Sequence, residues 1–261
     1  MLIILYPLIS RTYYDYLANK AIGDYRKDLR QLKEEEHLER LNLANAYNSA
    51  LLSREQLHVV DPYDETEKNE GIKNYASMVE LREKIGVLTI PKIHMEFPIY
   101  AGTSESVLQK GVGHMEGTSL PVGGLSTHSV LTAHRGLPEN KLFTDLDKME
   151  IGDFFLVETI GGELAYIVTE TKVIEPTDID ALAIEKNKDQ LTLLTCTPYM
   201  VNSHRLLVTG ERTELPSDEL EELRNIKWYN HLISLAREYA WLLGVIFIIV
   251  IIRTVKKRKR D

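Results

Sequence analysis

The sequence of 261 residues predicts a mainly β domain, either a sandwich or a barrel, with helices before it and a membrane anchor after it. Three observations predict this arrangement: polar, helix-periodic residues at 11–53, short β-type runs at 85–213, and an uncharged apolar run near the C-terminus. The chain is 44% hydrophobic and 27% charged, which is typical of globular proteins. A wholly disordered chain and a polytopic membrane protein are therefore excluded.

The N-terminal residues are predicted to be helical. Residues 1–10 are apolar but too short to span a membrane, and they lack the positive charge of a signal peptide. We interpret them as the remnant of a membrane helix whose start lies upstream, with a short core segment as the alternative. Residues 11–53 form a helical extension that packs against another part of the protein. Its apolar stripe has spacings of three and four, at Ile22, Tyr25, Leu29 and Leu32.

Residues 54–84 are predicted to be a loop and connector. The stretch 61–71 combines Pro and Gly with many acidic residues and has no periodicity. It should be a solvent-exposed loop.

Residues 85–213 should form the β domain. Seven or eight short β-type runs fit a sandwich or a barrel, and no helix-strand alternation indicates a doubly wound sheet. The clearest runs are 86–90, 94–100, 129–132, 154–159, 164–173, 191–195 and 206–209.

The C-terminal region reads as an acidic linker or juxtamembrane helix (214–238), a transmembrane anchor (239–253) and a basic cytoplasmic tail (254–261). The uncharged run Ala240–Ile252 has thirteen residues. Such a helix is about 20 Å long, against a hydrocarbon core of about 30 Å. A buried terminal helix is therefore the alternative. The basic residues directly after the run favour an anchor, because positive charge marks the cytoplasmic end, and the residues before 238 would then be extracellular.

Charge and cysteine content exclude two further classes of function. The net charge is −8, yet the last nine residues hold six of the 31 basic groups, so the rest of the chain is strongly acidic. A protein this acidic does not fit nucleic-acid binding, which needs a basic surface. A single Cys excludes an intramolecular disulfide and a Cys-rich zinc site, and no clustered carboxylates support another metal site.

The single cysteine, Cys196, ends a β-type run, and Pro198 stops that run two residues later. A strand end would expose the thiol on a rigid scaffold, as a nucleophile requires. The alternative is a buried thiol that behaves as a small hydrophobic residue. Position alone leaves both interpretations open.

Two residues that could lie near Cys196 favour a catalytic thiol. Arg205 begins the next β-type run, so antiparallel pairing would bring it close to Cys196, where a guanidinium can stabilise a thiolate and an oxyanion. His134 lies where another run ends, and an imidazole beside a thiol can hold a proton for the leaving amine. Three further histidines compete with it and are more typical of structural or surface positions, namely His114, His128 and His204.

These residues resemble the sortase family. The segment Thr192–Cys196 is similar to its TLxTC signature, with Arg205 and His134 at the places of the family's Arg and His. Three other segments are similar, namely 117–124, 142–146 and 152–154. The resemblance implies a closed eight-stranded β-barrel with short helices. It also implies Cys196 as nucleophile, His134 as general acid and base, Arg205 as oxyanion stabiliser, and no cofactor.

The flanking segments resemble class C, pilus-assembling sortases, in which an Asp-Pro-aromatic lid covers the active site. By that resemblance Asp61, Pro62 and Tyr63 form the lid, with Tyr63 over Cys196 and Asp61 paired with Arg205. The implied partners are the membrane and pilin subunits that carry an LPxTG-like sorting signal and an acceptor Lys. Two alternatives are a sortase that anchors single proteins to a cell-wall amine and a surface binding module with an inert Cys196.

Overall fold

The computed structural model describes residues 2–52, 62–63, 78–81, 83–137 and 140–214. The helices are α1 (Leu2–Gln31), α2 (Glu34–Leu52) and α4 (Glu105–Leu108), with 3-10 turns η2 (Pro91–Ile93), η3 (Leu142–Lys148) and η4 (Ile179–Leu182). The strands are β1 (Lys84–Ile90), β2 (Met95–Ala101), β3 (Val112–His114), β4 (Thr127–Thr132), β5 (Phe154–Thr159), β6 (Gly162–Ile174), β7 (Asp189–Thr197) and β8 (His204–Thr213).

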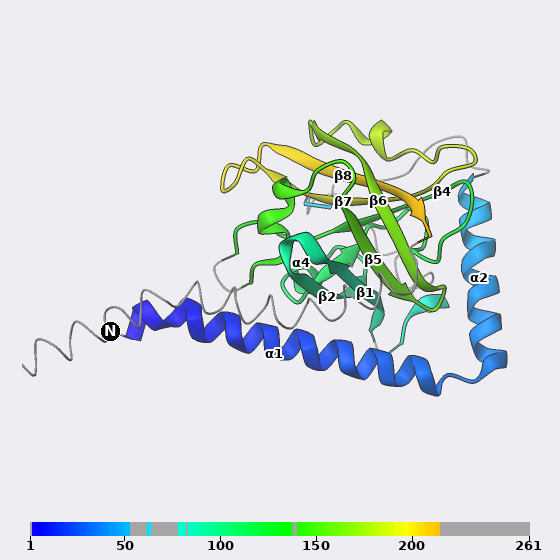
Figure 1. Ribbon diagram of the computed structural model, residues 1–261, viewed down its shortest axis with the longest axis horizontal. Helices are drawn as coiled ribbons and strands as arrows, with labels where there is room; N and C mark the ends of the chain where they lie inside the picture. The colour runs from blue at the N-terminus through cyan, green and yellow to red at the C-terminus, as the bar shows by residue number, and fades with distance from the viewer. Residues whose placement is uncertain (1, 53–61, 64–77, 82, 138–139, 215–261) are drawn as a thin grey trace, which may run out of the picture. The chain divides into compact units, whose positions relative to one another are not determined.

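The eight strands close into a barrel in the order β1-β2-β3-β4-β7-β8-β6-β5. Figure 1 shows the barrel with most of its strands labelled. Every β-type run named from the sequence is a strand, so the barrel alternative is confirmed and the sandwich is wrong. β2 pairs with β3, and β4 with β7, in parallel, whereas the other pairs are antiparallel. The parallel β4–β7 pair matters most, because it brings two distant strand ends to the same edge.

The barrel interior is filled by alternating apolar side chains. Phe155 and Tyr166 stack with ring centroids 5.6 Å apart, and both are almost completely buried. Gly210 lies directly beneath them, since a Cβ atom there would come within 2.9 Å of the Phe155 ring. The larger aromatic side chains therefore fit only because the facing position has no side chain.

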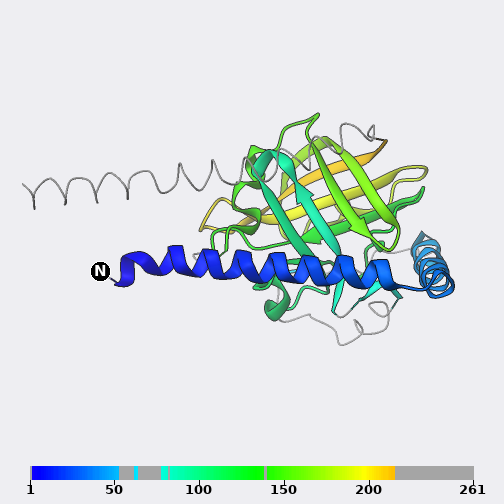
Figure 2. The ribbon, with the colours of Figure 1, turned by 60° about the horizontal axis from the view of Figure 1, so that its bottom comes forward.

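Helix α1 packs along the outside of the barrel (Figures 1 and 2). Tyr25 is fully buried and donates a hydrogen bond to the Ile85 carbonyl at 3.2 Å. Arg26 joins α1 to two strands, with contacts of 3.0 Å to Glu96 on β2 and 2.7 Å to Glu158 on β5. The predicted apolar stripe is confirmed, because Ile22 and Tyr25 are buried and Leu29 and Leu32 pack against the core.

A buried amide helps to fix helix α2 to the barrel, together with a contact of 2.6 Å between His37 Nε2 and the Ile160 carbonyl. The Asn48 side chain donates to the Leu120 carbonyl at 3.1 Å and accepts from the Leu120 N–H at 2.7 Å. These two bonds satisfy both backbone groups of Leu120, so the amide holds the 117–124 loop as a neighbouring strand would.

The terminal segments are described only in part. A single helix, α1, crosses the boundary between residues 10 and 11, where the sequence suggested a change from membrane remnant to extension. Within the described ranges, no helix is both long enough and apolar enough to cross a membrane. The predicted linker, anchor and basic tail fall at 215–261, outside those ranges.

Candidate active site

Strand register brings Cys196, His134 and Arg205 together. On one side of β7, antiparallel pairing places Cys196 directly opposite Arg205 of β8. On the other side, parallel pairing places Leu194 opposite Thr132 of β4, so two more residues along each chain bring Cys196 level with His134. Cys196 and Arg205 therefore lie on neighbouring strands, and His134 lies two residues beyond the end of β4, at the same edge of the barrel.

The thiol is buried, which decides between the exposed and the buried side chain that its position in the sequence left open. Cys196 is only 7% exposed. The strand is rigid as expected, with Thr195 donating to the Ala133 carbonyl at 2.8 Å, but Tyr63 comes from a distant segment and packs over this edge. A strand end does not guarantee access when another part of the chain covers it.

Tyr63 occupies the space between the imidazole and the guanidinium. Its ring centroid lies 5.7 Å from that of His134 and 5.1 Å from Arg205 Cζ. Its hydroxyl donates to the Ala133 carbonyl at 2.7 Å and accepts from Thr132 Oγ1 at 2.9 Å. Burial, followed by the nearby charge of Cys196, raises the pKa of Tyr63, so the phenol stays protonated and keeps donating.

The guanidinium of Arg205 is held by its own turn. Arg205 is 7% exposed, and Nη1 donates to the Asn202 and His204 carbonyls at 3.0 Å each. The predicted pairing with Asp61 concerns a residue outside the described ranges, while Pro62 of the same predicted lid is buried.

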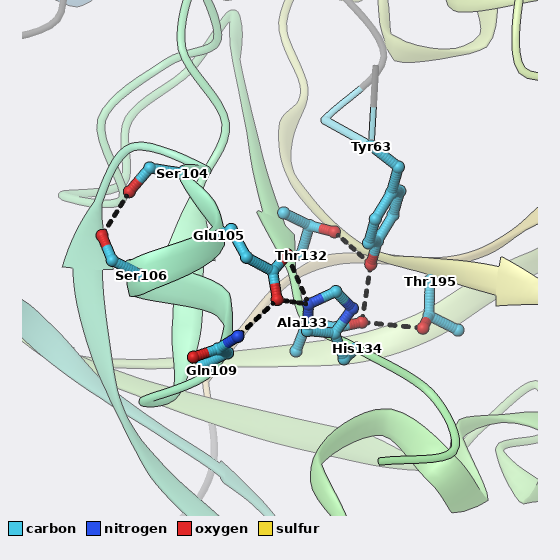
Figure 3. Close-up of polar contacts among 9 residues, drawn as sticks. All are labelled: Tyr63, Ser104, Glu105, Ser106, Gln109, Thr132, Ala133, His134 and Thr195. Carbon is cyan, nitrogen blue, oxygen red and sulfur yellow. Dashed lines mark hydrogen bonds and ion pairs between the residues drawn. The ribbon is translucent and has the colours of Figure 1, made fainter. Parts of the chain in front are cut away.

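The carboxylate that contacts His134 could not be identified from the sequence. In Figure 3 the imidazole lies between Glu105 on one side and Tyr63 on the other. Its Nε2 is 3.1 Å from Glu105 Oε2, and Gln109 Nε2 donates to Glu105 Oε1 at 2.9 Å. Glu105 lies 29 residues before His134 on α4, and no motif or period connects the two positions.

The loop after His134 is anchored by Arg135, whose role was also missed. Its side chain is almost fully buried, contacts Asp147 at 2.6 Å and donates to Thr197 Oγ1 at 3.0 Å. Thr197 directly follows Cys196, so Arg135 ties the histidine loop to the cysteine strand. The only available signal was an Arg next to the candidate His, which is too common to interpret.

The other three histidines are structural or at the surface, as the sequence indicated. His114 is fully buried against the Ser119 carbonyl at 2.9 Å, and burial lowers its pKa to about 4. His128 bridges the Ala183 carbonyl and Thr192, and burial lowers its pKa as well. His204 is partly exposed and pairs with Glu175 at 3.1 Å.

The site therefore combines a thiol, an imidazole and a guanidinium around one edge of the barrel. Such a set can form a covalent acyl intermediate, with the thiol as nucleophile, the imidazole moving the proton and the guanidinium stabilising an oxyanion. Within the part of the chain that the structure covers, no three potential metal ligands lie together.

Known proteins carry the same fold and motifs. A sortase-domain family model matches residues 88–213. Sortase D of Bacillus subtilis is 33% identical over 144 residues, which cover 54% of this chain and 70% of that protein.

Two solved structures are more similar still. Sortase C-1 of Streptococcus pneumoniae is 49% identical with a TM-score of 0.71, and the match covers 76% of this chain and 100% of that one. A pilus-related sortase C of group B Streptococcus is 46% identical with a TM-score of 0.68, over 74% of this chain and 96% of that one. The chain belongs to the sortase family of cysteine transpeptidases, and its structural neighbours are class C sortases.

Proposed function

We propose that the protein is a pilus-assembling, membrane-anchored sortase that cleaves an LPxTG-like signal between Thr and Gly and joins the Thr to a pilin Lys. One observation supports the catalytic part of the proposal: Cys196 pairs with Arg205 in the β7–β8 ladder, and the parallel β4–β7 ladder ends two residues before His134 and Cys196. Similarity to a pilus-related sortase C supports the choice of substrate.

The first half-reaction forms a thioester. The Cys196 thiolate attacks the Thr carbonyl, and the tetrahedral oxyanion accepts hydrogen bonds from Arg205. Collapse of this intermediate breaks the Thr–Gly bond, and protonated His134 gives its proton to the departing Gly amine. The products are an acyl-enzyme, a free amine and a neutral imidazole.

The second half-reaction restores the enzyme. A neutral Lys amine attacks the thioester carbonyl, and His134 takes the proton that the amine loses as the new amide bond forms. The thiolate leaves, and the isopeptide bond keeps the acyl group. One amide replaces another, so no cofactor is needed, and the covalent step divides a difficult exchange into two easier ones.

Tyr63 acts in this scheme as a lid. Its ring fills the space between His134 and Arg205, where the scissile bond must bind. Substrate therefore enters only after the segment containing Asp61, Pro62 and Tyr63 has moved away. Asp61 would add an ion pair with Arg205 that keeps the guanidinium neutralised at rest.

The membrane localisation in this proposal rests on the sequence alone. Residues 239–253 would anchor the protein in the membrane, with the barrel outside the cell and residues 254–261 in the cytoplasm. This placement would bring the active site close to pilin subunits as they emerge from the membrane.

The test uses purified protein and an LPxTG peptide. Mass spectrometry should detect a thioester adduct on the parent and none on Cys196→Ala, whose fold is checked by circular dichroism. The peptide is then offered to either a pilin Lys or a cell-wall cross-bridge amine. Preference for the cross-bridge amine would overturn the pilus assignment, and absence of any adduct in the parent and in Tyr63→Ala would overturn the transpeptidase.

A further inference from the structure

The imidazole of His134 has a charged partner on the side away from Tyr63 (Figure 3). Both carboxylate oxygens of Glu105 lie within hydrogen-bonding reach of Nε2, at 3.1 and 3.3 Å. The second nitrogen, Nδ1, is then the one left to exchange a proton with substrate.

The chemistry of this contact selects one form of the ring. An ionised carboxylate can only accept hydrogen bonds, so Nε2 must carry the hydrogen that it donates to Glu105. In the neutral imidazole only one nitrogen is protonated, so Nδ1 is left bare and able to accept a proton. After it accepts one, the adjacent carboxylate balances the positive charge of the ring.

The carboxylate itself is held in place, which distinguishes it from an ordinary surface ion pair. Gln109 donates to Glu105 Oε1 at 2.9 Å from one turn further along the same segment. The chain two residues before α4 is fixed as well, since buried Thr103 donates to both oxygens of Glu116 through its N–H (3.0 Å) and its hydroxyl (2.9 Å). The backbone that presents Glu105 is thus attached to the barrel through side chains outside α4.

We propose that Glu105 is the positioning residue of His134: it fixes the ring orientation and the tautomer, so that Nδ1 faces the reacting atoms. The inference rests on the proposed transpeptidase function. It adds a fourth member to the site, one that acts through His134 and does not touch substrate. Gln109 supports it by holding the carboxylate.

The kinetic test compares Glu105→Gln with Ser106→Ala in a Tyr63→Ala background, so that lid opening does not limit the rate. Ser106 is exposed on the same short helix and bonds only to Ser104 among the contacts in Figure 3, at 3.0 Å. It is the control for damage to α4. The maximal rate of thioester formation with the LPxTG peptide should fall at least tenfold in Glu105→Gln, with KM within twofold, and stay unchanged in Ser106→Ala.

A spectroscopic measurement on the resting protein tests the tautomer without using activity. ¹⁵N–¹H correlation spectra of histidine-labelled protein, with His134 assigned by its loss in His134→Ala, should show bare Nδ1 and protonated Nε2 in the neutral ring. Glu105→Gln should shift this pattern toward protonated Nδ1, because an amide can also donate to Nε2.

The outcomes separate this proposal from the proposed function. A normal acylation rate in Glu105→Gln overturns the positioning role, as does an equal loss in Ser106→Ala. If neither the parent nor Tyr63→Ala forms a thioester, the transpeptidase proposal fails, and the spectra alone decide about Glu105. In that case an unchanged tautomer in Glu105→Gln overturns the inference.

Discussion

Replacing Tyr63 should expose the Cys196 thiol to alkylation. The Tyr63 hydroxyl holds the lid closed through two hydrogen bonds, with Ala133 and Thr132. Each contributes about 1 kcal/mol net to the stability of the closed lid. The ring over Arg205 adds about 1 kcal/mol as a cation–π contact. If the thiol reacts only while the lid is open, removing about 3 kcal/mol from the free energy of lid closure should raise the alkylation rate by roughly 100-fold. About 1.4 kcal/mol corresponds to a factor of ten.

The assay is favourable because the chain contains one cysteine, so every alkylation event reports Cys196. Iodoacetamide in excess is added to the parent, Tyr63→Phe and Tyr63→Ala, and the adduct is followed by mass spectrometry. The Phe variant loses only the two hydroxyl bonds, about 2 kcal/mol, so its rate should rise by roughly 30-fold. Tyr16→Ala on α1 removes an exposed tyrosine elsewhere and should react like the parent.

The order of the three rates tests the reasoning. Equal rates in Tyr63→Ala and the parent would refute the lid. If Tyr63→Ala reacts faster while Tyr63→Phe does not, the ring covers the thiol but its hydroxyl bonds contribute nothing to closure.

Three further substitutions test the packing around the site. Arg135→Ala should lower the free energy of unfolding by about 2 kcal/mol, measured by urea denaturation, because Thr197 loses a charged donor; it should also slow thioester formation. Asn48→Ala should cost about 1–2 kcal/mol in the same assay, because the buried Leu120 N–H loses its partner, while the Leu120 carbonyl still accepts from the Val122 N–H. Burial lowers the pKa of His114 to about 4 from 6.5. The unfolded chain therefore binds the proton first, and between about pH 7 and pH 5 this histidine removes about 2 kcal/mol of stability, a loss that His114→Gln should abolish.

Each of these three predictions has an outcome that would contradict it. Lys141→Ala breaks an exposed ion pair with Asp145 and should cost about 0.5 kcal/mol or less; an equal cost in Arg135→Ala would show that the anchor adds nothing. Full stability in Asn48→Ala would mean that the Leu120 N–H finds another partner. An unchanged pH dependence in His114→Gln would assign the acid sensitivity to other groups, such as His128.

The sequence predicted the strands and the pairing of Cys196 with Arg205 because both depend on local patterns. Alternating residues define a strand, and a short loop between two strands favours antiparallel neighbours. Strand β3 was missed because Val112–His114 has three residues, too few to show alternation. The Glu105 contact was missed for a different reason, because it depends on where a distant segment crosses the barrel edge. The position of Cys196 left its burial open, and only the resemblance placed Tyr63 over it.

The site is thereby held in two physically different ways. Cys196 and Arg205 are set by a backbone ladder, so substitutions of neighbouring side chains should leave their spacing unchanged. His134 lies two residues beyond the end of β4, and its position depends on side-chain contacts from Glu105 and Arg135. Changes near the imidazole should therefore alter the rate of proton transfer while the nucleophile stays in place. This makes the side chains around His134, more than the barrel strands, the positions at which members of this fold can differ in rate without losing the reaction.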